Sequence, residues 1–134
     1  MSIFIEKAVQ NQRAANILLQ DSYKCYVSSV HCAYYGVFQL MAHILRHEVG
    51  SGNYNYWNEW GAKGSHEQTI GKIFDAIQQR DKKQATHFKR MIEVLKNNRV
   101  TADYKEKEVT IEFSSFAVEQ SEKLHSLLRT TFNI

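Results

Sequence analysis

The sequence predicts an all-α protein, an up-and-down bundle of four to five helices in a single domain covering residues 1–134. Three observations support this prediction. The chain contains no proline, the residue that most often interrupts a helix. Apolar residues recur at steps of three and four through several long segments, which places them on one helix face. No internal repeat or change of composition marks a boundary between domains.

The longest periodic segment, Tyr23–Val49, is predicted to be the central helix of the bundle. Its apolar positions are Tyr23, Val27, Val30, Tyr34, Val37, Met41 and Ile44. A second face carries the small residues Cys25, Ser29, Cys32 and Gly36, which would let a neighbouring backbone approach closely. A helix with one apolar face and one small face is expected to have neighbours on both sides.

The other elements follow from the same period and from capping residues. A first helix over residues 2–20 would be capped by Ser2, and Asp21–Ser22 would cap the central helix. Ser65, with Gln68 three residues later, fits the capping box of a third helix. A loop is predicted over 50–65, and the third helix is predicted to end near Arg80. A fourth helix runs from about Lys82 to about Tyr104 and is followed by a linker over 105–111. The last helix runs from 113–115 to about Phe132, with Phe116 on its buried line.

The composition limits which binding partners and which cellular compartment are expected. The formal net charge of +3 is compatible with nucleic acid but does not require it. Without a signal-peptide-like start or a bilayer-length apolar run, the expectation is a cytoplasmic protein with no membrane partner. Cys25 and Cys32 lie about 10 Å apart along one predicted helix, too far for a disulfide, and are expected to be buried free thiols.

Arg99 is the main candidate for function, because it falls near the centre of the apolar stripe of the fourth helix. An uncompensated buried charge costs several kcal/mol, and Asp103, one turn later, is the nearest candidate partner. Two interpretations remain open: a structural arginine tied to Asp103 or a carbonyl, and an arginine that holds phosphate in a cleft. Lys96 lies beside it, on either a phosphate-tracking edge or an ordinary solvated helix face.

The histidines offer weaker signals. His66, in the first turn of the third helix, could serve acid–base chemistry or merely cap the helix. His31, at the edge of the core stripe, is expected to bond a carbonyl or a tyrosine. His43 and His47 have the i,i+4 spacing of two metal ligands, but no further ligand motif accompanies them, so neither a metal nor a cofactor is expected.

An aromatic loop, Tyr54–Trp60, has two possible roles. Its four large rings could form a lid packed over the bundle, or a stacking surface for bases or a partner protein.

Several segments together resemble HEPN ("higher eukaryotes and prokaryotes nucleotide-binding") domains. The segments Ala14–Leu19 and Ser29–Phe38 are similar to the first two helices of that family. Lys63–His66 resembles the short basic–Ser/Thr–His element that opens the third helix in small prokaryotic members. Leu95–Tyr104 resembles their Arg-x-x-Ala-Asp-Tyr segment, so the similarity spans nearly the whole chain.

The resemblance implies a helical bundle that commonly dimerises, and often a nucleotidyltransferase-type partner in a toxin–antitoxin or defence system. Many members are metal-independent endoribonucleases, in which histidine follows the catalytic arginine after four to six residues. Arg99 matches the arginine, but Tyr104, Lys105 and Glu106 occupy the positions where the histidine would lie.

Three hypotheses follow from the residues and the resemblance. The first is a nucleotide- or RNA-binding or accessory module, whose site around Arg99 includes Tyr34, Tyr35, His31, Lys96, Asp103 and Tyr104. The second is a ribonuclease in which Arg99 stabilises the transition state while His66 or His31 moves the proton. The third is a purely structural interaction protein.

Overall fold

The computed structural model describes residues 2–20, 22–49 and 64–134, and within them helices are the only regular secondary structure. The helices are α1 (Ile3–Leu18), α2 (Tyr26–His43), the π-helical turn η1 (Ile44–Val49), α4 (Ser65–Gln78), α5 (Lys82–Tyr104) and α6 (Ile111–Phe132). This confirms the predicted all-α bundle, and α5 has the predicted bounds. Among these helices none combines the length and the apolar character needed to cross a bilayer.

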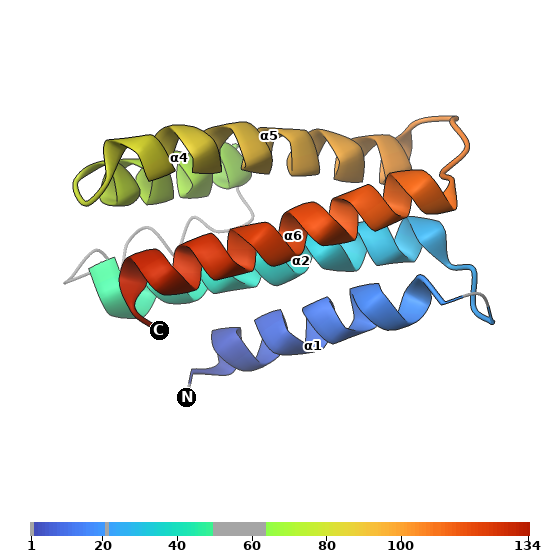
Figure 1. The fold of residues 1–134 in the computed structure, drawn as a ribbon, viewed down its shortest axis with the longest axis horizontal. Coiled ribbons are helices and arrows are strands. Elements are labelled where there is room, and N and C mark those ends of the chain that lie inside the picture. The colour runs from blue at the N-terminus through green and yellow to red at the C-terminus, as the bar shows by residue number, and fades with distance from the viewer. Residues whose placement is uncertain (1, 21, 50–63) are drawn as a thin grey trace.

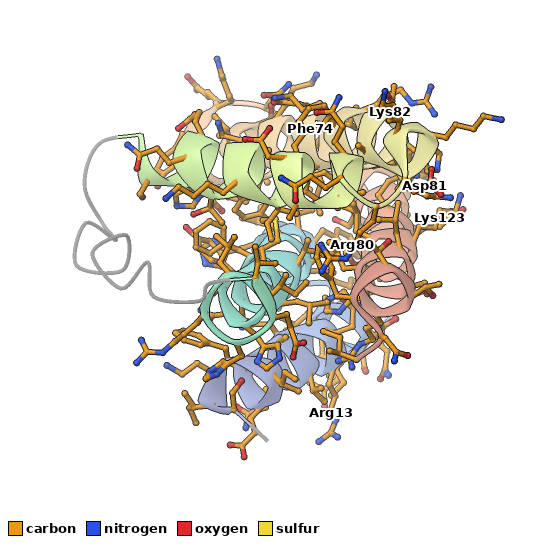
Figure 2. All side chains as sticks on the ribbon, turned by 90° about the vertical axis from the view of Figure 1, so that its left-hand side faces the viewer. Arg13, Phe74, Arg80, Asp81, Lys82 and Lys123 are labelled. Atoms are coloured by element: carbon orange, nitrogen blue, oxygen red, sulfur yellow. The ribbon has the colours of Figure 1, made fainter. Side chains whose placement is uncertain are left out.

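The helix α2 is the centre of the bundle, as the sequence predicts. It lies beside α6 through the middle of the molecule, with α4 and α5 on one side of this pair and α1 on the other (Figure 1). The end-on view in Figure 2 gives the same three layers. Since α2 contacts α1, α4, α5 and α6, its side chains set the spacing of the whole bundle.

The apolar face of α2 is buried along most of its predicted length. Its positions from Val30 to Ile44 have no exposed surface or almost none. The expected start of the helix is wrong: Tyr23 is 55% exposed and Val27 44% exposed. The chain turns at Lys24, which has a positive φ of 52°, so the helix begins only at Tyr26 and Tyr23 remains outside the core. Val27 belongs to the first turn of α2 but faces away from the core.

The small face of α2 packs against α1. The Ser29 hydroxyl donates a 2.7 Å hydrogen bond to the Ala15 carbonyl oxygen. This bond links α2 directly to α1. At Gly36 a Cβ atom would lie 3.3 Å from the Ala8 carbonyl oxygen, so the two backbones are close enough to favour glycine. The expectation of two buried thiols is wrong, because Cys25 is exposed and Cys32 only half-buried; both are free.

Two of the predicted caps are wrong. The N-cap of α2 is Cys25, which makes no side-chain cap hydrogen bond, and not Asp21–Ser22. Ser2 caps α1 as expected, with its hydroxyl oxygen accepting from the Ile5 N–H at 3.3 Å. The cap of α4 is Gly64, in a left-handed conformation with φ of 83°, and not Ser65. The Ser65 carbonyl oxygen instead accepts a hydrogen bond from the Thr69 hydroxyl. Asp21 and residues 50–63, including the aromatic loop, lie outside the described residues.

The last helix starts earlier than expected, at Ile111, because Thr110 caps it by accepting from the Phe113 N–H. Phe116 is 42% exposed, so its predicted place on the buried line is wrong. The buried line of α6 includes small and polar residues that a search for large apolar side chains overlooks: Ser114, Ala117, Val118, Ser121, Leu124, His125, Leu128 and Phe132.

We predict opposite effects of side-chain addition at two helical glycines. Gly36→Val should lower the free energy of unfolding by about 1–3 kcal/mol, because the added atoms press on the backbone of α1. Gly71→Ala is the control, since a Cβ there meets nothing within 4 Å. This substitution should raise the free energy of unfolding by about 0.5–1 kcal/mol. Urea unfolding followed by circular dichroism measures both values. A neutral or stabilising Gly36→Val would contradict the close packing of α1 on α2.

Candidate functional site

The guanidinium of Arg99 lies under tyrosine rings at the interface between α5 and α2. The residue is 8% exposed. Its Cζ atom lies 5.1 Å from the ring centroid of Tyr34, 5.5 Å from that of Tyr35 and 5.7 Å from that of Tyr104. Because tyrosine faces carry negative charge density, these contacts offset part of the cost of removing the arginine from water.

Asp103 is the counter-charge of Arg99, as the sequence predicts, but the arginine does not hold it alone. The Arg99 Nη1 and Asp103 Oδ2 atoms are 3.6 Å apart, while the same Oδ2 lies 2.8 Å from the His31 Nδ1. The expected carbonyl or tyrosine partner of His31 is therefore wrong. The His31 ring also leans on Tyr35, with 4.6 Å between the centroids.

The hydrogen-bonding capacity of Arg99 is largely unused. A guanidinium carries several N–H donors in a planar fork. Its Nε atom is buried and has no hydrogen-bond partner, and Asp103 is its one ion-pair partner within the described residues. Most buried polar groups in proteins are satisfied, so an unsatisfied donor on a charged group calls for a partner such as water or a bound anion.

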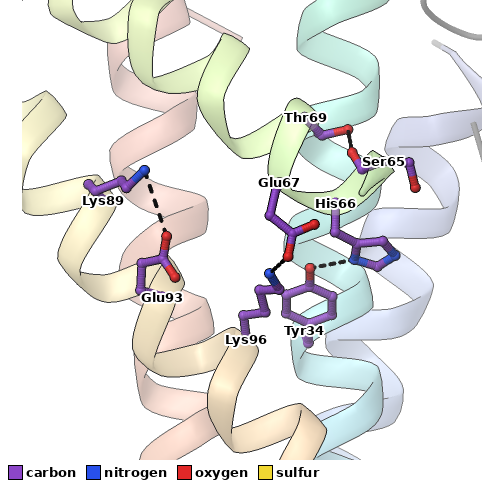
Figure 3. Close-up of polar contacts among 8 residues, drawn as sticks. All are labelled: Tyr34, Ser65, His66, Glu67, Thr69, Lys89, Glu93 and Lys96. Atoms are coloured by element: carbon purple, nitrogen blue, oxygen red, sulfur yellow. Dashed lines mark hydrogen bonds and ion pairs between the residues drawn. The ribbon is translucent and has the colours of Figure 1, made fainter. Parts of the chain in front are cut away.

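His66 approaches the same tyrosines from the first turn of α4. Its Nδ1 atom lies 2.7 Å from the Tyr34 hydroxyl (Figure 3). Its ring stacks on Phe38, with 4.4 Å between the centroids. Burial lowers the pKa of His66, and the positive charges of Arg99 and Lys96 lower it further. The imidazole is therefore neutral at pH 7.

The Tyr34 hydroxyl keeps its proton, because burial raises the pKa of the phenol well above its ordinary value. A hydroxyl that donates to the His66 Nδ1 atom leaves the imidazole proton on Nε2. In this arrangement His66 presents an N–H donor on the side of its ring away from Tyr34.

Lys96 lies next to His66 but is not a free cation. Its ammonium group forms an ion pair with Glu67 on the first turn of α4, and the lysine lowers the pKa of that carboxyl (Figure 3). Lys89, seven residues before Lys96 on the same face of α5, lies 3.7 Å from Glu93. Both lysines are thus paired with carboxylates, which weakens the interpretation of this helix face as a continuous phosphate-tracking edge.

All of the predicted site residues meet in one place, which we call the Arg99 cluster. Its members are Arg99, Asp103, Tyr104, Tyr34, Tyr35, His31, His66 and Lys96. The cluster reaches the surface through Tyr104, which is 74% exposed, and His31, whose side chain is 48% exposed. Sequence reasoning missed Phe38 and Glu67; Phe38 lies one helical turn after Tyr34, and Glu67 directly follows His66, so both had a positional signal.

The histidine pair at the end of α2 serves a structural contact. The His43 Nδ1 atom lies 2.5 Å from the Ser2 hydroxyl and its Nε2 atom 3.5 Å from Glu48, while the ring of His47 is 5.0 Å away. Over residues 2–20, 22–49 and 64–134, no group of three or more His, Cys, Asp or Glu side chains is placed to hold a metal ion.

Comparison with known proteins adds no assignment. The chain matches no protein-family model, no curated protein and no solved structure. The function is therefore inferred from the geometry of the Arg99 cluster.

We predict that Asp103→Asn lowers the free energy of unfolding by roughly 2–3 kcal/mol, because it leaves the buried Arg99 without its counter-charge. The matched control is Glu93→Gln, which removes an exposed i,i+4 pair with Lys89 on the same helix and should cost at most about 0.5 kcal/mol. Denaturant unfolding measures both. Equal losses in the two variants would show that Asp103 does not compensate a buried charge.

We predict that protonation of His66 weakens the fold. Its folded-state pKa lies below the ordinary value of 6.5, so the unfolded chain binds this proton more readily. The contribution to stability is complete above pH 6.5 and is lost as the pH falls from 6.5 through the folded-state pKa. His66→Gln should reduce the slope of the free energy of unfolding against pH below pH 6.5. The pKa values of His43 and His125 are lowered as well, so these residues preserve part of that slope.

The ring of His66 should correspondingly titrate with a midpoint below 6.5 when followed by NMR. A midpoint above 6.5 would contradict the burial and the charge environment described for this side chain.

Proposed function

We propose that this protein is a HEPN-like module that binds RNA or a nucleotide, with the Arg99 cluster holding a phosphate group. The observation that carries the proposal is the nearly buried guanidinium of Arg99, whose Nε has no partner and whose single carboxylate is shared with His31. A phosphate accepts from an arginine fork through two oxygens at once, which suits these unfilled donors.

Neighbouring groups support a nucleic-acid ligand over a bare anion. The Nε2–H of His66 is a further neutral donor for a phosphate oxygen, in the tautomer set by Tyr34. Tyr104 is the most exposed ring of the cluster and offers a face on which a base can stack. This combination of a cationic fork and exposed aromatic faces is typical of sites for single-stranded RNA.

The second candidate function is a metal-independent ribonuclease, and the neutral His66 beside Arg99 favours it. For this reaction His66 would take the other tautomer, with its Nδ1–H donating to the Tyr34 oxygen, so that its Nε2 atom is free to accept a proton. That Nε2 atom would accept the proton of a ribose 2′-hydroxyl while the 2′-oxygen attacks phosphorus and the 5′-oxygen leaves with a proton from water. Arg99 would stabilise the negative charge that develops on the phosphoryl oxygens. We rank this function second, because Tyr104 stands where the family's histidine would lie and tyrosine, with an ordinary pKa of ~10, is a poor base at neutral pH.

The setting of the module is proposed from the family resemblance alone. In this proposal the protein is cytoplasmic, forms a homodimer, and acts beside a nucleotidyltransferase-type partner in a toxin–antitoxin or defence system. Light scattering that gives a monomer at micromolar concentration would remove the dimer from the proposal. A purely structural interaction protein remains the alternative if the Arg99 cluster binds nothing.

We predict that Arg99→Lys weakens binding of a short single-stranded RNA at least tenfold, because lysine keeps the charge but loses the planar fork. The matched control is Arg80→Lys. Arg80 also lies over an aromatic ring, 4.7 Å from the centroid of Phe132, and belongs to the α4–α5 turn (Figure 2). Fluorescence anisotropy at fixed low salt measures both affinities.

Equal affinities for Arg99→Lys and Arg80→Lys, or no binding by the wild type, would overturn the proposal. The same proteins incubated with RNA in EDTA separate the two candidate functions. Cleavage by the wild type that is lost in both Arg99→Lys and His66→Gln would promote the ribonuclease, and binding without cleavage would support the module.

A further inference from the structure

A second candidate site lies on the other side of the bundle, in a groove between α1 and α6. The groove has a volume of about 420 Å³ and shares no residue with the Arg99 cluster. It is separated from that cluster by the α2–α6 pair, since α1 and the α4–α5 layer lie on opposite sides of it (Figure 1). The lining residues are Val9, Gln12, Arg13 and Asn16 of α1, and Glu122, His125, Ser126 and Arg129 of α6.

Two arginines give the groove its charge. Arg13 belongs to α1 and Arg129 to the last turn of α6, and neither has an ion-pair partner in the described parts of the chain. Glu122 is the one carboxylate on the lining, so the groove carries a net positive charge. Guanidinium groups without an ion-pair partner on the lining of one groove favour an oxyanion.

The wall of the groove contains a buried histidine without a full set of partners. His125 is 9% exposed, and its Nε2 atom is buried with no hydrogen-bond partner. Burial and the nearby Arg129 lower the pKa of His125 to about 4, so its ring is neutral at pH 7. A neutral imidazole has one donor and one acceptor nitrogen, and a hydroxyl group can pair with either.

Gln12 provides a second unsatisfied group on the opposite wall. Its Oε1 atom lies 3.1 Å from the Ser121 hydroxyl, which also donates to the Val118 carbonyl oxygen at 2.7 Å. A hydroxyl has one proton, so the two contacts are best satisfied when the amide is turned and its nitrogen donates to Ser121. In either orientation the other polar atom of the Gln12 amide is buried and unpaired.

From these observations we infer that the α1–α6 groove binds a small hydroxylated phosphomonoester, of which a sugar phosphate is the simplest kind. Arg13 and Arg129 hold the phosphate, while hydroxyl groups of the ligand pair with the His125 imidazole and the Gln12 amide. The requirement for hydroxyl groups follows from the His125 imidazole and the Gln12 amide, because a hydroxyl can pair with either a donor or an acceptor. This inference does not depend on RNA binding by the Arg99 cluster.

The test is calorimetric titration of the full chain with ribose 5-phosphate, inorganic phosphate and ribose. We expect ribose 5-phosphate to bind at least tenfold more tightly than either of the other two. Arg129→Gln should weaken that binding at least tenfold, while Lys123→Gln should leave it unchanged. Lys123→Gln is the matched control, because it removes the same charge from an exposed site of the same helix outside the groove (Figure 2).

An NMR titration of the wild type keeps the inference testable even if Arg129→Gln fails to fold. The ring signals of His125 should shift on addition of ribose 5-phosphate, and those of His87, an exposed residue on α5, should not. No binding at millimolar ligand, an unchanged His125 ring at saturation, or equal weakening by Arg129→Gln and Lys123→Gln would each overturn the inference. A loss of RNA binding in Arg99→Lys with intact ribose 5-phosphate binding would support two separate sites.

Discussion

The burial of one positive charge, that of Arg99, constrains the half of the bundle where α5 meets α2. A guanidinium in that position needs compensation, which comes from the Asp103 carboxylate and the faces of Tyr34, Tyr35 and Tyr104. The two adjacent tyrosines of α2 must therefore face α5 at the level of Arg99, which fixes the register between the helices. The compensation is incomplete, since one carboxylate oxygen serves both Arg99 and His31, and this incompleteness is what makes the cluster a candidate site.

The two faces of α2 divide the molecule into regions with different chemistry. Its large apolar face holds the tyrosines and Phe38 against α4 and α5, and His66 joins them from α4. Its small face, at Ser29 and Gly36, lets α1 approach closely. Because α1 is held there and α6 lies beside α2, a groove forms between α1 and α6 that is remote from the Arg99 cluster. A single central helix thus separates two candidate anion sites of different character.

Periodicity predicted most of the fold, because long helices without proline leave a strong repeat. It predicted the approximate bounds of α5 and the core of α2 from Val30 onward. It failed where a local conformation decided the outcome: a turn at Lys24 excludes Tyr23 from the core, and the left-handed Gly64 replaces Ser65 as a cap. Phe116 was misplaced because α6 buries small and polar side chains, and hydrophobicity alone does not identify these.

The residues of the Arg99 cluster were named from one amphipathic stripe and one resemblance, but their mutual contacts are a tertiary property. Periodicity places Asp103 one turn after Arg99 on the same helix face, but not the contact between Asp103 and His31, which joins residues far apart in the chain. The groove between α1 and α6 had no sequence signal, because Gln12, Arg13, His125 and Arg129 are unremarkable on their own helices. Their relevance arises only when packing leaves polar atoms without partners.

The central claim is that the unfilled N–H donors of Arg99 are available to a phosphate from outside the protein. The most direct measurement is an NMR titration that follows the arginine Nε–H signals while a short single-stranded RNA is added. We predict that the Arg99 signal shifts in proportion to bound RNA and that the Arg80 signal stays in place. An Arg99 signal that remains unchanged at saturation would contradict the account, since the guanidinium would then be a structural group sealed by Asp103.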